Sequence, residues 1–131
     1  NGALAGLVAI TAEPLTPGPI TAMVIGSIGA VIMYYGTKLL ENLGLDDVVG
    51  AIPVHMFAGI FGTLVVPLTN ADTSFGTQLI GVISVCVFSF VLSWITFSTL
   101  KSTVGLRISR AAERQGTDKA EVGVIAYSIR D

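Results

Sequence analysis

The sequence predicts an all-α fold, a polytopic bundle of transmembrane helices, from its composition and its long uncharged runs. Of the 131 residues, 52% are hydrophobic and 12% are charged, whereas an ordinary soluble domain carries about 25% charged residues. Three runs contain no charged residue: 14–37, 48–71 and 73–100, with 24, 24 and 28 residues. About 20 apolar residues cross the hydrocarbon core of a bilayer as a helix, so each run is long enough to span it.

The first 12 residues are also uncharged but too few to cross a bilayer alone. We expect a partial helix over 1–12, ended by Pro14 and Pro17, because proline lacks a backbone donor and clashes inside a helix. The sequence opens without an initiator methionine or a basic signal segment. We therefore expect the chain to be a carboxy-terminal fragment of a longer protein.

Three further membrane segments are expected, at 20–43, 48–69 and 75–104. With the partial helix they form a transmembrane region over 1–104, followed by a polar tail over 105–131 with a short amphipathic helix near 109–115. Gly26 and Gly29 give the second segment a face of small residues, which favours close packing of helices in membranes.

Asp46 and Asp47 stand just before the third segment. We interpret them as structural or capping residues, because carboxylates near a helix N-terminus accept its free backbone amides and interact favourably with the helix dipole.

The seven basic residues fall in two places. Lys38 lies near the end of the second segment, and the others lie near or beyond the end of the fourth: Lys101, Arg107, Arg110, Arg114, Lys119 and Arg130. The positive-inside rule places both groups in the cytoplasm. We expect an integral multi-pass protein of a bacterial inner or plasma membrane with a cytoplasmic C-terminus. A net charge of −2 without a concentrated basic face argues against a nucleic-acid partner.

His55 is the only histidine and lies inside the second long uncharged run. An ionisable side chain at membrane depth is costly and is a functional-site hypothesis by default. Two interpretations stay open: His55 lines a polar path, or a neighbouring helix satisfies its ring. In α-helical register its face also holds Ala51, Ile52, Ala58, Gly59 and Gly62.

The sequence contains no pattern typical of an enzyme, a metal centre or a cofactor site. One histidine and two aspartates supply too few ligands at these spacings to hold a metal, and Cys86 is a lone cysteine in an apolar run. No nucleophile with a nearby base and no phosphate loop is present. We therefore expect neither enzymatic activity nor a metal or cofactor.

Several motifs follow one another in the order and spacing of a known family. They are 1–11 (NGALAGLVAIT), Asp46-Asp47 leading to His55, 58–62 (AGIFG), 105–107 (GLR), and then Glu113, Gly116, Asp118 and Ala126-Tyr127. With these motifs the sequence resembles the last part of an ammonium transporter of the Amt/Mep/Rh family.

The resemblance implies an all-helical protein with eleven spans per subunit, assembled as a homotrimer with one pore in each subunit. This chain would hold part of the eighth span, the last three spans and the cytoplasmic tail. His55 matches the second of two adjacent pore histidines, and Thr11 resembles a residue near the pore wall. In bacteria, a PII-type regulatory protein can dock near the tail.

The chain departs from the family pattern at a few positions. Many relatives carry aspartate at the position of Gly50 and glycine at that of Met56. In the tail, Val122 and Val124 stand where histidine and glutamate are common, and Arg110 falls in a stretch that is usually acidic. The departures in the tail affect the contacts that the tail can make and any regulation through those contacts. The assignment of His55 as a pore residue is little affected by the departures.

The resemblance implies transport of ammonium or ammonia through a histidine-lined hydrophobic pore. A bare ammonium ion enters a dry apolar bore only at a high free-energy cost, whereas ammonia is neutral. Two touching imidazoles offer a donor and an acceptor that can relay the proton separately. The alternative is an ammonium sensor that uses the same membrane fold to signal through its tail. A third interpretation, a scaffold subunit with a purely structural histidine, is disfavoured by the motifs.

Overall fold

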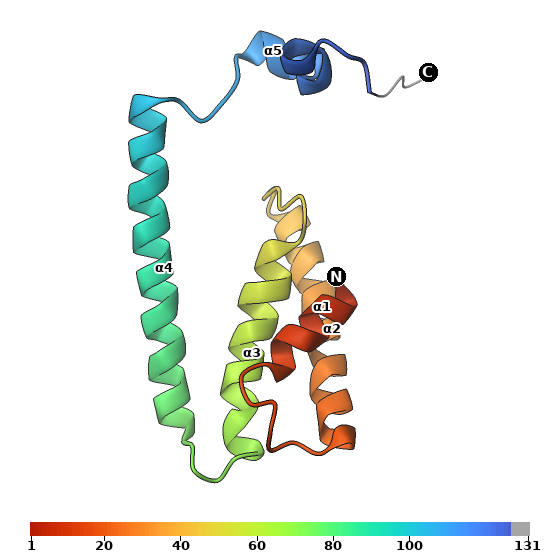
Figure 1. The fold of residues 1–131 in the computed structure, drawn as a ribbon, viewed down its shortest axis with the longest axis vertical. Coiled ribbons are helices and arrows are strands. Elements are labelled where there is room, and N and C mark those ends of the chain that lie inside the picture. Colours follow the sequence, from red (N-terminus) through yellow and green to blue (C-terminus); the bar gives the residue numbers. More distant parts are fainter. Residues whose placement is uncertain (127–131) are drawn as a thin grey trace. The chain divides into compact units, whose positions relative to one another are not determined.

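The computed structural model describes residues 1–126, and every regular element in that range is a helix (Figure 1). The elements are α1 (Gly2–Ile10), α2 (Pro19–Asn42), η1 (Ile52–Phe57), α3 (Ala58–Val65), η2 (Val66–Leu68), α4 (Phe75–Thr103), α5 (Arg110–Gln115) and η3 (Asp118–Val122). Of these, η1 and η3 are π-helices and η2 is a 3-10 helix. The predicted all-α class is confirmed. Tyr127 and Arg130 lie outside the described residues.

Two of these helices, α2 and α4, are long and apolar enough to cross a membrane. Together, η1, α3 and η2 form a shorter apolar helix over Ile52–Leu68. The chain divides into two compact units, residues 1–87 and 88–131, with the boundary inside α4. His55 and the residues that position it belong to the first unit.

In the first unit, α1 packs against both α2 and α3 through small residues (Figure 1). Ala5 and Ala9 on α1 and Ala58 at the start of α3 are almost completely buried. A Cβ atom added to Gly6 would lie 3.1 Å from the carbonyl oxygen of Gly26 on α2. Small side chains allow helices to approach this closely, and van der Waals contacts of this kind are a main source of helix association in a bilayer.

Two polar contacts tie the ends of α1 to the helix formed by η1 and α3. Before α1, the side-chain amide of Asn1 donates to the carbonyl of Val49 (3.0 Å). After α1, the carboxylate of Glu13 accepts a hydrogen bond from the side chain of Asn70 (2.8 Å). The Asn70 amide, with a smaller effect from the backbone amide of Leu15, lowers the pKa of Glu13 below its usual 4.5. Since both contacts join corresponding ends, α1 runs parallel to that helix.

The segment expected at 48–69 is helical over Ile52–Leu68, after a turn. Gly50 closes this turn with a φ of +72°, a left-handed value that favours glycine. A side chain at this position would also collide with Asn1, whose amide nitrogen lies 2.6 Å from an added Cβ. The backbone conformation of Gly50 therefore delays the start of the helix.

In the second unit, the short helix expected near 109–115 is observed as α5, which spans Arg110–Gln115. Ser109 caps α5, because its hydroxyl oxygen accepts the backbone amide of Ala112 (3.2 Å). Arg107 pairs with Glu113 across this cap at 2.9 Å.

Candidate functional site

His55 lies in η1, a single π-helical turn that leads directly into α3. The backbone amide of Ala58 donates to the carbonyl of Pro53, five residues back, as well as to that of His55. Pro53 itself has no N–H to donate, and the carbonyl of Val49, four residues before it, accepts the Asn1 side chain instead. Turns of this kind inside α-helices occur frequently at functional sites.

The side chain of His55 is exposed in the described chain, whereas Pro53, Val54 and Ala58 around it are buried. No side-chain hydrogen bond within residues 1–126 involves the imidazole. Ala58 and Gly62, which α-helical register placed on the face of His55, are buried instead. The wider π-turn explains this difference, because its i→i+5 bonding shifts the register of the residues that follow.

Asp47 holds the N-terminal end of the helix that carries His55. Its carboxylate accepts backbone hydrogen bonds from Ala51 (2.9 Å) and Ile52 (2.7 Å). The first amides of a helix lack intrahelical acceptors, and a negative charge beside them interacts favourably with the helix dipole. Asp46 is exposed and makes no such bond among the described residues.

Thr11 follows the last residue of α1, away from His55. Its hydroxyl donates to the carbonyl of Val8 (2.6 Å). Val8 lies beside Gly59, so Thr11 stands about two helical turns, on the order of 10 Å, farther along the parallel helix than His55. The structure therefore does not bring these two side chains into contact.

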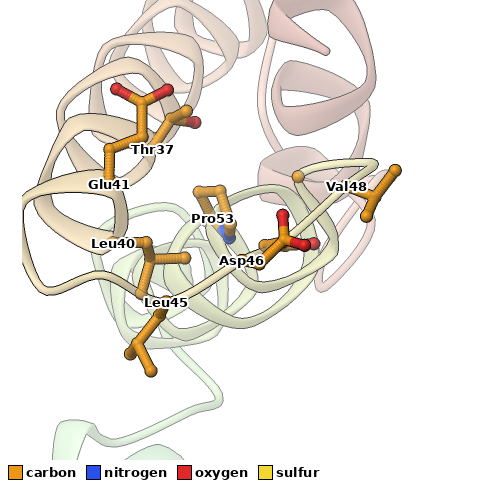
Figure 2. A pocket seen from close by; sticks show the side chains of 9 residues that line it. Thr37, Leu40, Glu41, Leu45, Asp46, Val48 and Pro53 are labelled. Carbon is orange, nitrogen blue, oxygen red and sulfur yellow. The ribbon is translucent and has the colours of Figure 1, made fainter. Parts of the chain in front are cut away.

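A cavity of about 220 Å³ lies beside the N-terminal end of η1 (Figure 2). It is lined by Thr37, Leu40, Glu41, Leu45, Asp46, Asp47, Val48, Gly50 and Pro53. Three of these residues are acidic, but within residues 1–126 no group of histidine, cysteine and acidic side chains is arranged to hold a metal ion. His55 is not a lining residue, so the cavity is distinct from the candidate pore position.

Sequence reasoning missed the two contacts that fix α1 against the helix of His55, Asn1 to Val49 and Glu13 to Asn70. Each joins residues about 50 positions apart, for which a single sequence carries no direct signal. The one local hint was Pro53, because a proline near the start of a helix leaves an earlier carbonyl free for another donor.

Comparison with known proteins supports the resemblance. The Ammonium Transporter Family model matches residues 1–127. The ammonium transporter Amt2 of Archaeoglobus fulgidus is 39% identical over 97% of this chain and 31% of its own length. A putative ammonium transporter of Synechocystis is 39% identical over 92% of this chain and 24% of its own length. The ammonium transporter of Corynebacterium glutamicum is 32% identical over 98% of this chain and 32% of its own length.

The chain thus spans 24% to 32% of the length of these relatives, which are named as transporters rather than enzymes. The match covers both units of the fold and includes His55, Asp46, Asp47 and Thr11. The chain belongs to the ammonium transporter family.

Proposed function

We propose that the protein carrying this chain conducts ammonium or ammonia across a membrane, and that His55 lines its pore. The family match over residues 1–127 carries the proposal. The setting of His55 supports it, because an exposed imidazole stands on the apolar helix Ile52–Leu68 without a hydrogen-bond partner in the described part of the chain. At membrane depth such a side chain is costly unless water, substrate or another polar group meets it.

The proposed chemistry is a proton transfer. Ammonium gives one proton to an imidazole nitrogen and becomes ammonia, which crosses the apolar stretch as a neutral molecule. Because the two ring nitrogens of a histidine accept and donate separately, the proton can leave by the other nitrogen. We propose that segments outside this chain supply the facing wall, including a second histidine. In this scheme Thr11 belongs to the pore wall, and Asp47 holds the turn that presents His55.

We further propose a homotrimer in a bacterial inner or plasma membrane, with the tail in the cytoplasm and a PII-type protein as a regulatory partner. Basic residues cluster at and beyond the end of α4, which supports the cytoplasmic position of the tail by the positive-inside rule.

The test is ammonium transport by the full-length protein in proteoliposomes. We expect His55→Ala to abolish flux or to weaken selectivity against potassium. Met56→Ala is the matched control, because Met56 is an exposed neighbour on the same turn, and it should retain both properties. Unchanged flux and unchanged selectivity in His55→Ala would reject the pore role. Binding of ammonium by the wild type without any flux would favour the sensor instead.

A further inference from the structure

Gly36, in the C-terminal half of α2, lies directly against the π-turn η1 that carries His55. It is buried, and α2 packs against η1. A Cβ atom added to Gly36 would lie 2.5 Å from Cδ2 and 2.9 Å from Cε2 of Phe57, and 3.0 Å from Cβ of Pro53. Because Gly36 has no side chain, Phe57 and Pro53 can both pack against the backbone of α2.

Pro53 and Phe57 stand on either side of His55 in the sequence, two residues before it and two residues after it. Residues four apart are neighbours on one face of a helix, whereas residues two apart do not face each other. The common contact of Pro53 and Phe57 with Gly36 shows that they share a face in η1 as well. His55, midway between them, therefore points away from α2.

The hydrogen bonds of η1 leave part of its direction to packing. Pro53 has no N–H to donate, and the carbonyl of Val49 accepts the side chain of Asn1 on another segment. Sharp changes in helix direction occur at prolines and at π-bulges, and η1 is both a π-turn and the site of Pro53. The contact with Gly36 is thus placed where the backbone alone constrains the direction of the helix least.

We propose that Gly36 is a positioning residue for His55. The contact of Pro53 and Phe57 with the backbone of α2 sets the direction in which the imidazole points. The proposal rests on the proposed function for the role of His55 in the pore, but the placement of the ring can be measured without transport.

Gly36→Ala is the direct test, and Gly29→Ala is its matched control. Gly29 is also a buried glycine of α2. A Cβ atom there would lie 2.7 Å from Cβ of Ala9 and 3.0 Å from the carbonyl oxygen of Ala5, both on α1. Both variants therefore overpack a contact of α2, but only Gly36→Ala acts on the residues beside His55.

The experiment is solid-state NMR of the full-length protein, carrying isotope-labelled histidine, in proteoliposomes. The imidazole signals of His55 are assigned by their loss in His55→Ala. These signals report which ring nitrogen carries the proton and which groups the two nitrogens meet. We expect Gly36→Ala to shift the His55 signals and Gly29→Ala to leave them in place.

Phe57→Leu tests the same contact from the other side, without overpacking, and serves if Gly36→Ala does not fold. It should also shift the His55 signals. In the Phe57→Leu background, Gly36→Ala should shift them less than it does alone, because the aromatic ring that the new methyl group meets is absent. Such a dependence of one substitution on the other is the mark of residues in contact.

Ammonium flux is measured in the same proteoliposomes and is normalised to the amount of folded protein. A displacement of about 1 Å can cost roughly a hundredfold in rate where a reacting group must be placed accurately. We therefore expect Gly36→Ala to lower the flux at least about tenfold, and Gly29→Ala to lower it less.

Unchanged His55 signals in folded Gly36→Ala would overturn the proposal, because the ring of Phe57 would then yield without moving the turn. Equal shifts in Gly36→Ala and Gly29→Ala would overturn it as well, since they would indicate a general loosening of α2. A shift confined to Gly36→Ala, in a protein whose wild type conducts no ammonium, would support the positioning role while rejecting the proposed function.

Discussion

Replacing Gly62 by alanine tests the backbone contact that holds α3 against α1. A Cβ atom at position 62 would collide with the carbonyl oxygen of Ala9 and would lie 2.8 Å from its carbonyl carbon and from its Cα. Gly59, one turn earlier on the same helix, is the matched control. A Cβ atom there meets only a methyl group of Val8 at 3.6 Å, an ordinary van der Waals contact.

The two substitutions share one effect and differ in another. Both gain helix propensity, about 0.5–1 kcal/mol. Gly62→Ala also overpacks the helix contact, which costs about 1–3 kcal/mol, and backbone atoms cannot rotate away as a side chain can. We expect Gly62→Ala to have a free energy of unfolding about 2 kcal/mol lower than that of Gly59→Ala, roughly a 30-fold change in the ratio of folded to unfolded protein.

The assay is denaturant unfolding of the full-length protein in detergent, with both variants measured under the same conditions. Because η1 leads directly into α3, we also expect Gly62→Ala to displace His55 and to lower ammonium flux more than Gly59→Ala does. Equal free energies of unfolding in the two variants would refute the backbone contact between α1 and α3.

Three further predictions concern polar contacts. Asp47→Ala removes the acceptor of two helix amides and should lower the free energy of unfolding by about 1 kcal/mol, whereas Asp46→Ala should change it little; parallel thermal unfolding of the two variants checks this. The pKa of Glu13 is lowered below 4.5 by Asn70, so its contribution to stability is present above that pH and is lost as the pH falls through the lowered pKa. Acid unfolding should show this loss in the wild type but not in Glu13→Gln, and identical acid titrations would contradict it. The backbone amide of Ala126 lowers the pKa of Asp118 below 3.8. The protection of that amide against hydrogen exchange, relative to its intrinsic rate at the same pH, should therefore be lost as the carboxyl is protonated and should be lower at neutral pH in Asp118→Asn. Equal protection in the two proteins would count against the contact.

The sequence alone could predict the features that depend on neighbouring residues. Helices were expected at 20–43 and 75–104, and the structure has α2 at Pro19–Asn42 and α4 at Phe75–Thr103. Apolar runs and the prolines that interrupt them are local properties. His55 was identified in the same way, as one ionisable side chain in an uncharged run.

The contacts between segments were not predictable in this way. The bond between Asn1 and Val49, and the collision that excludes a side chain at Gly62, both depend on which faces of two helices meet. A membrane helix is apolar on nearly every face, so hydropathy says little about which face turns toward a neighbour. The π-turn that carries His55 also contains Pro53, which has no amide to donate, and the carbonyl of Val49 before it accepts a hydrogen bond from Asn1 on another segment.

The sequence by itself therefore determined that α2 and α4 form helices long enough for a bilayer and that the chain carries the motifs of ammonium transporters. Only the tertiary structure decided which side of its helix His55 lies on and which residues of the other helices contact α1. The physical reason is the separation in sequence of the residues that interact. Helix formation and membrane insertion depend on residues close in sequence, whereas the direction in which a side chain points depends on contacts between residues far apart in sequence.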